Sequence, residues 1–293
     1  MRKVPILALI SILILVAPQS WGSGEQSQLL QNRGSDSMAI AVIAWAETYG
    51  RFDPAARISV SGGGSGTGIA ALINGVANIA NASRAITEKE VKRARERNIE
   101  PTEHLVGHDA VAIYIHRDNP IDSLSKSQLR EIFADGGTFE HWNDLGIEVP
   151  GCKDQTIVRV SRQSSSGTYT LLRKVLLGGS RYKPGTLEMQ GSKDVVELVS
   201  KTPCAIGYSS YAYETPDVRA ACISTQAGAD CVDPSISGVS NKSYPLSRSL
   251  YMYTNGQPAG AIKDYIEWVL SDQGQCILIQ KRYAPVRKVT CGG

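Results

Sequence analysis

The sequence predicts an α/β protein in which strands and helices alternate from one end of the chain to the other. Short apolar runs of strand length alternate with amphipathic segments, and no low-complexity linker or internal repeat interrupts them. Of the 293 residues, 42% are hydrophobic and 20% are charged, which is enough apolar surface for a large core or for two lobes. Alternation of this kind favours buried sheets covered by helices.

The first 24 residues have the pattern of a cleaved secretory signal peptide. Arg2 and Lys3 precede an apolar stretch from Ile6 to Val16, and small residues follow at Ser20, Gly22, Ser23 and Gly24, where a signal peptidase could cut. The alternative is a transmembrane anchor, but an anchor needs about 20 apolar residues and this stretch is shorter. We therefore expect export to the periplasm or to the exterior, with a mature chain that begins near residue 25.

The patterns that follow predict four strands and seven helices. The strands are expected at 57–61, within 105–116, at 156–160 and at 205–209. The helices are expected from about 38 to 49 and at 67–76, 88–98, 126–133, 167–177, 192–200 and 259–270. Open α/β sheets bind ligands in a crevice at the carboxyl ends of their strands, so we expect the functional site there.

Three of these helices begin in a loop that is rich in serine and glycine. The loops are Gly34-Ser35-Asp36-Ser37, Gly62-Gly63-Gly64-Ser65-Gly66 and Ser164-Ser165-Ser166-Gly167-Thr168. The first N–H groups of a helix have no partner within it, and the macrodipole adds about half a positive charge there. Hydroxyl groups add donors, and glycine lets an anion approach the backbone, so three converging loops would bind a small tetrahedral oxyanion.

Two arginines lie beside these loops and could contribute charge to the site. Arg84 follows Asn81-Ala82-Ser83, and Arg162 precedes the third loop. The planar guanidinium group suits a two-point contact with phosphate oxygens. The alternatives are that each loop only caps its helix and that each arginine is solvated or paired with an acid; the conjunction of three loops and two arginines favours the anion site.

All six cysteines follow the predicted signal peptide, which favours disulfide bonds in an exported chain. Six cysteines allow fifteen pairings. Pairing Cys222 with Cys231 and Cys276 with Cys291 would close two local loops and leave Cys152 for Cys204. A zinc site is the alternative, but no CxxC pair or histidine at ligand spacing accompanies the cysteines.

Other function classes find little support in the sequence. The net charge is +3 and approaches neutrality once Arg2 and Lys3 are removed, whereas a nucleic-acid-binding protein is expected to be clearly basic. No P-loop pattern is present, and the glycine-rich second loop lacks the nucleophile-elbow spacing. His104 and His108 are four residues apart, a spacing that suits a metal site on a helix, but the segment has strand character. With none of these motifs supported, we expect no metal, no cofactor and no catalytic residue.

The order of these motifs resembles that of the periplasmic phosphate-binding components of bacterial phosphate ABC transporters. The resemblance runs through GSDSM (34–38), SGGGSGTGI (61–69), ANIANASR (77–84), DAVAIYI (109–115), LREIF (129–133), VSRQSSSGTY (160–169) and AIGY (205–208). It covers about residues 30–213 and weakens beyond. Each stretch alone is a weak signal, whereas their ordered series is specific.

This resemblance implies a type II periplasmic-binding-protein fold with a ligand cleft between two α/β lobes. Lobe one would contain residues 25–110 and 212–293, and lobe two would contain residues 111–211. The chain would cross between them near 109–112 and 207–211. The protein would be a monomer that binds inorganic phosphate in the cleft and delivers it to an inner-membrane ABC permease, with no chemical step.

Carried over residue by residue, the resemblance also implies the phosphate ligands. They would be Ser37, Met38, Ser65, Gly66, Arg162, Ser166, Gly167 and Thr168, and the neighbouring Ser83 and Arg84 complete the candidate set. Many family members have an aspartate where Ser83 stands, and that carboxylate accepts the proton of monohydrogen phosphate. Asp36 and Asp109 are then the candidate proton acceptors, with helix capping or an ion pair as the alternative role for Asp36. A phosphate-ester hydrolase that uses a loop serine, and a binder of another oxyanion or a sensor without a transport role, remain the competing functions.

Overall fold

The computed structural model describes residues 29–226 and 228–292. The predicted signal peptide therefore lies outside the described residues. Within the described ranges, no helix is both long enough and apolar enough to cross a membrane.

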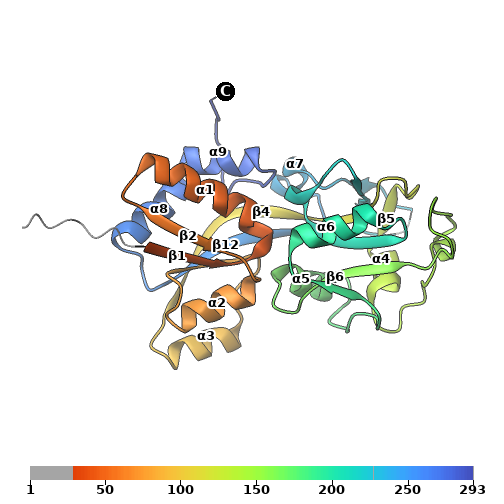
Figure 1. Ribbon diagram of the computed structural model, residues 1–293, viewed down its shortest axis with the longest axis horizontal. Helices are drawn as coiled ribbons and strands as arrows, with labels where there is room; N and C mark the ends of the chain where they lie inside the picture. The colour runs from red at the N-terminus through yellow and green to blue at the C-terminus, as the bar shows by residue number, and fades with distance from the viewer. Residues whose placement is uncertain (1–28, 227, 293) are drawn as a thin grey trace, which may run out of the picture.

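In the described part of the chain, one mixed sheet of nine strands has the order β2-β1-β3-β12-β4-β8-β6-β7, with β9 also paired to β4. Figure 1 shows this sheet running through the molecule from β1 and β2 in the first half to β6 in the second. Its strands are β1 (Leu29–Gly34), β2 (Arg57–Ser61), β3 (Ile79–Ala82), β4 (Pro101–His116), β6 (Val158–Arg162), β7 (Leu187–Met189), β8 (Ala205–Ser210), β9 (Val218–Ala220) and β12 (Ser247–Asn255). A second sheet of three short strands contains β5 (Ser123–Ser125), β10 (Cys222–Ser224) and β11 (Cys231–Val232).

Strand β4 divides the large sheet into two halves because it changes partner along its length. Residues Pro101–Ala110 pair with the antiparallel β12, and residues Val111–Ile115 pair with β8. The change falls between Ala110 and Val111, within the segment where the sequence predicts the first crossing. β4 therefore carries the chain from the first half of the molecule to the second.

The first half has helices on both faces of its sheet (Figure 1). The 3-10 turn η1 (Asp36–Met38) leads into α1 (Ala39–Phe52), which packs with α8 (Gly260–Leu270) and α9 (Asp272–Gln280) around one apolar core. The helices α2 (Ser65–Ile73) and α3 (Glu88–Arg95) pack around a second core that includes Ile69, Leu72 and Tyr253. Trp45 is fully buried in the first of these cores and donates its indole N–H to the Gly274 carbonyl at 2.7 Å.

The second half is built in the same way. Helix α6 (Ser192–Lys201) covers one face through Val195, Val196 and Val199. The helices α4 (Lys126–Phe133), α5 (Gly167–Val175) and α7 (Ile236–Ser240) contribute to the larger core on the other face, which includes Trp142. Two short 3-10 turns, η2 (Trp142–Leu145) and η3 (Tyr211–Tyr213), complete the described elements.

The predicted α/β class is correct, and each of the predicted strands and helices has a counterpart at nearly the predicted residues. Residues 212–293 were assigned to lobe one from the sequence; the segment from Val218 to Leu246 contacts elements of the second half. β9 pairs with the second half of β4, β10 pairs with β5, and Tyr244 and Leu246 lie in the core of the second half. The chain returns to the first half only at β12, because Ser247 pairs with Ala110.

Three disulfides join Cys152 to Cys204, Cys222 to Cys231 and Cys276 to Cys291. The predicted pairing is therefore confirmed. The first bridge spans 52 residues, and the other two close loops of 9 and 15 residues.

Candidate anion-binding site

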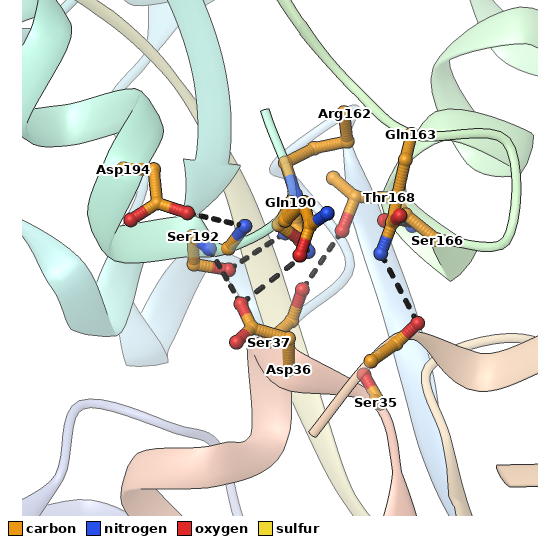
Figure 2. A network of polar contacts seen from close by, with 12 residues as sticks. Ser35, Asp36, Ser37, Arg162, Gln163, Ser166, Thr168, Gln190, Ser192 and Asp194 are labelled. Carbon is orange, nitrogen blue, oxygen red and sulfur yellow. Dashed lines mark hydrogen bonds and ion pairs between the residues drawn. The ribbon is translucent and has the colours of Figure 1, made fainter. Parts of the chain in front are cut away.

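The three serine- and glycine-rich helix starts meet where the two halves of the molecule face each other. Ser37 in η1 and Ser65 at the start of α2 come from the first half, and Thr168 in the first turn of α5 comes from the second. The hydroxyl oxygens of Ser37 and Thr168 lie 2.8 Å apart across this junction (Figure 2). All three side chains are 0–1% exposed, so their hydroxyl groups are almost completely removed from water.

Glycines bring the loops close enough for this convergence. Gly34 has a φ of 141°, and a Cβ atom there would lie 2.1 Å from the Asn81 carbonyl oxygen. Gly64, which precedes α2, has a φ of 101°, and its Cβ would lie 2.8 Å from the Ser165 carbonyl oxygen of the opposite half. A side chain at either position would push the loops apart, and only glycine adopts such φ values readily.

Ser83 joins the three loops at the end of β3. Its Oγ accepts from the Ser35 hydroxyl at 2.9 Å and lies 3.3 Å from the Ser65 Oγ, and its N–H donates to that Ser65 oxygen at 3.0 Å. A Cβ on Gly167 would lie 2.5 Å from the Ser83 Oγ and 2.6 Å from the Ser65 Oγ. We call the side chains of Ser35, Ser37, Ser65, Ser83 and Thr168 the hydroxyl cluster.

Two backbone N–H groups of the predicted set bond to protein carbonyls in this structure. The Met38 N–H donates to the Ser35 carbonyl at 3.1 Å, and the Gly66 N–H donates across the junction to the Ser165 carbonyl at 2.9 Å. Ser166 is the N-cap of α5, because its hydroxyl accepts from the N–H groups of Thr168 and Tyr169 at 3.1 and 3.5 Å. Ser166 therefore caps α5, and a hydroxyl that accepts these bonds still has one hydrogen that it can donate.

Arg162 lies at the end of β6, just before the third loop. Its guanidinium group is fully buried and donates to the Ser192 hydroxyl at 2.8 Å and to the Gln190 carbonyl at 2.7 Å (Figure 2). The Nε–H is buried and has no hydrogen-bond partner within the described part of the chain. Burial lowers the pKa of Arg162, and the nearby Asp36 carboxylate opposes that shift. An unpaired buried donor of this kind suits an anion.

Asp36 connects the two halves. Its carboxylate accepts from the Ser192 N–H at the start of α6 and lies 3.3 Å from the Arg162 guanidinium (Figure 2). The Asp36 carbonyl accepts from the Tyr213 hydroxyl at 2.7 Å. The ion pair with Arg162 is the alternative that the sequence left open for Asp36.

The other two charged candidates also have partners. Arg84 forms a two-point ion pair with Glu90 at 2.7 and 2.8 Å, and its Nη2 lies 3.6 Å from the position of a Cβ on Gly66. Although burial would raise it, the pKa of Glu90 is lowered by the hydrogen bonds from Arg84 and Thr87. Asp109 is fully buried and pairs with Arg248. These pairs leave little net charge around the hydroxyl cluster.

Several contacts across the junction were not predicted, and two of them involve Gln163 and Arg248, which were not candidate site residues. The side chains of Gln163 and Ser165 donate to the Gly63 carbonyl at 3.1 and 3.0 Å. Arg248 donates to the Thr168 hydroxyl at 2.8 Å. Contacts between loops that lie 100 residues apart in the sequence cannot be predicted from a local pattern. Arg248 could have been identified, because it occupies a buried position in a strand whose residues alternate between buried and partly exposed.

The described residues offer one cluster of potential metal ligands, formed by Cys152, Asp154 and Cys204. The two cysteines of that cluster form a disulfide, so it is not a metal site.

A family model described as a PBP superfamily domain matches residues 22–273 of the chain. Among curated relatives, the phosphate-binding protein PstS of Pseudomonas aeruginosa is 32% identical over 268 residues, which cover 88% of this chain and 83% of the relative. PstS of Bacillus subtilis is also 32% identical, over 90% of this chain and 83% of its own length.

Solved structures give the same result. A phosphate ABC transporter substrate-binding protein from Clostridium perfringens, solved with bound phosphate, superposes with a TM-score of 0.78 at 27% identity over 89% of this chain and 100% of its own. An ABC-type phosphate transport receptor from Vibrio cholerae superposes with a TM-score of 0.67 at 27% identity, over 87% of this chain and 99% of its own.

Proposed function

Because the chain belongs to the PstS family of phosphate-binding proteins within the PBP superfamily, we propose that it captures inorganic phosphate for an ABC transporter. The observation that carries this proposal is the meeting of three helix starts around a buried hydroxyl cluster, with Ser37 and Thr168 contributed by opposite halves. The helix starts and the hydroxyls both supply donors, and a phosphate oxygen offers only acceptors when it is ionised.

Phosphate would replace the hydrogen bonds that the hydroxyl groups now make to one another. Ser37, Ser65, Ser83 and Thr168 would turn their hydroxyl hydrogens toward the anion, and the unpaired Nε–H of Arg162 would add a charge-assisted bond. The Gly66 N–H can exchange the Ser165 carbonyl for a phosphate oxygen when the two halves separate slightly. The backbone N–H groups of Met38 in the first loop and of Gly167 in the third loop complete the proposed set of phosphate ligands.

The two halves would act as lobes that close on the ligand. We propose that lobe two extends to about residue 246, further than the sequence indicates, since β9, β10 and Leu246 pack with the second half. Closure would then bend the chain where β4 and β12 pass between the lobes, near Ala110 and Ser247. Contacts such as Asp36 with Ser192 would form only in the closed state.

Discrimination between phosphate and sulfate needs an acceptor for the phosphate proton. Asp36 is the stronger of the two candidates, because it lies in the first loop and faces Arg162, whereas both oxygens of Asp109 already accept hydrogen bonds. The Asp36→Asn variant would keep the size of the side chain and lose the charge. We expect sulfate to compete better against this variant than against the wild type; unchanged discrimination would exclude Asp36.

The cellular setting is part of the same proposal. Three disulfides support folding in an oxidising compartment, and the expected signal peptide would deliver the chain there. The closed monomer would dock on an inner-membrane permease and release phosphate to it. Fractionation of cells that produce the full-length chain would test this: recovery of an uncleaved protein in the cytoplasm would contradict it.

Equilibrium titration with phosphate tests the function itself. We expect phosphate to bind to the mature chain at micromolar or lower concentration with one site per chain, and sulfate to bind more weakly. A phosphate-ester hydrolase would be the competing result, so the same preparation is assayed for turnover of a phosphomonoester with zinc and magnesium present. Failure to bind phosphate, or clear turnover, would overturn the proposal.

A further inference from the structure

Arg248 and Asp109 form a buried ion pair at the point where the chain passes between the two halves. They stand directly opposite each other on β12 and β4. The Arg248 Nε and Nη2 donate to the same Asp109 carboxylate oxygen at 3.0 and 2.7 Å. The side chains are 3% and 0% exposed, so the pair is shielded from water.

Asp109 also fixes the pair to the second half. Its other carboxylate oxygen accepts from the Ser210 hydroxyl at 2.7 Å, at the end of β8. Burial raises the pKa of Asp109, and Arg248 and Ser210 oppose that shift by stabilising the carboxylate. Three strands are thus joined through one carboxylate, which leaves the Arg248 guanidinium little freedom to move.

The remaining guanidinium nitrogen reaches into the hydroxyl cluster. Arg248 Nη1 donates to the Thr168 Oγ1 at 2.8 Å. An arginine can only donate, whereas a hydroxyl donates one hydrogen and accepts through two lone pairs. Because Thr168 must accept from Arg248, its lone pair is directed at the arginine and its hydrogen is left for a partner on the opposite side. The Ser37 Oγ lies 2.8 Å from the Thr168 Oγ1, in position to accept that hydrogen, and the anion would accept it in a complex.

We propose that Arg248 is a positioning residue that orients the Thr168 hydroxyl as a hydrogen-bond donor toward the bound phosphate. The inference rests on the proposed function and extends it to a residue outside the three loops. Asp109 holds the guanidinium in place and cancels its charge, so the pair acts through Thr168 and adds no net charge to the site.

A double-mutant cycle tests this proposal because it separates an effect through Thr168 from any other effect. Removal of Arg248 alone would leave the Asp109 charge buried without a partner, which is strongly destabilising. The pair is therefore replaced together, as Asp109→Asn with Arg248→Met. This double variant, Thr168→Val and the triple combination are compared with the wild type by titration with inorganic phosphate, after thermal unfolding has shown that each is folded.

We expect the double variant to bind phosphate about tenfold more weakly than the wild type. Without Arg248, the Thr168 hydroxyl is no longer held with its hydrogen toward the anion, and its hydrogen bond to the charged phosphate weakens. In the Thr168→Val background, the same replacement should change the affinity less than about twofold, because the hydroxyl to be oriented is gone. The Thr168→Ser variant, which keeps the hydroxyl, should remain sensitive to the replacement.

Equal losses in the wild-type and Thr168→Val backgrounds would overturn the proposal, because Arg248 would then contact the anion directly or stabilise the closed state by another route. No loss in either background would also overturn it. A wild-type protein that does not bind phosphate would instead refute the proposed function, and the inference with it.

Discussion

Gly167 offers the sharpest test of the way in which the two halves meet. It is the first residue of α5, in the second half, and it faces Ser65 and Ser83 of the first half. An alanine Cβ there would lie 2.6 Å from the Ser65 hydroxyl oxygen and 2.5 Å from the Ser83 hydroxyl oxygen. Each oxygen would have to retreat by roughly 0.8 Å to reach ordinary van der Waals contact, and overpacking of this kind costs about 1–3 kcal/mol.

The cost of Gly167→Ala applies only when the halves are closed. Closure accompanies phosphate binding in the proposed mechanism, so we expect the phosphate affinity to fall about 5- to 150-fold. The folded state without ligand can open to relieve the contact, and alanine favours a helix over glycine. The free energy of unfolding without phosphate should therefore stay within about 1 kcal/mol of the wild type.

Calorimetric titration with phosphate and urea unfolding without phosphate measure the two quantities. Gly50→Ala is the matched control, since Gly50 lies in α1 and a Cβ there would have no neighbour within 4 Å. We expect Gly50→Ala to bind phosphate like the wild type. The reasoning is refuted if Gly167→Ala also binds phosphate like the wild type, because the two serines and Gly167 would then not meet in the bound state.

Three further predictions concern stability. Replacement of Cys152 and Cys204 by alanine should lower the free energy of unfolding by about 1.5 kcal/mol more than replacement of Cys222 and Cys231, because the first bridge spans 52 residues and the second spans 9; equal losses in urea unfolding would contradict this. The lowered pKa of Glu90 means that its ion pair stabilises the protein above the ordinary pKa of the carboxyl and ceases to do so as the pH falls through the lowered value. Glu90→Gln should thus lose less stability than the wild type between about pH 6 and pH 3, and parallel pH profiles would exclude the effect. Phosphate at 100 times its Kd should stabilise the wild type by about 2.7 kcal/mol, and sulfate at the same concentration should stabilise it less; equal stabilisation would mean that the site does not discriminate.

The elements around the site could be predicted from the sequence because their signals are local. The apolar stripe of each helix and the serine- and glycine-rich loop before it lie within about fifteen residues, so α1, α2 and α5 could be located from spacing. Strand β12 was not predicted, although its residues alternate between buried and partly exposed along most of its length. Its pairing with β3 and β4 joins residues more than 130 positions apart, and no local pattern encodes that register.

The partners of the charged side chains could be predicted only in part. Thr87 and Glu90 form a capping box at the start of α3, a spacing that is visible in the sequence. The same Glu90 carboxylate then binds Arg84, which explains why this arginine is held beside the cluster. The pairing of Asp109 with Arg248 depends on strand register, so the sequence left the role of Asp109 open.

The location of the bound anion is the most direct test of the whole account. Arsenate has the same shape and charge as phosphate, and its anomalous X-ray scattering marks its position in a crystal of the mature protein without any assumption about the ligands. We predict one strong peak within hydrogen-bond distance of the hydroxyl oxygens of Ser37, Ser65 and Thr168 and of the Arg162 guanidinium. A peak elsewhere on the molecule, or no peak at a concentration that saturates binding in solution, would contradict the account.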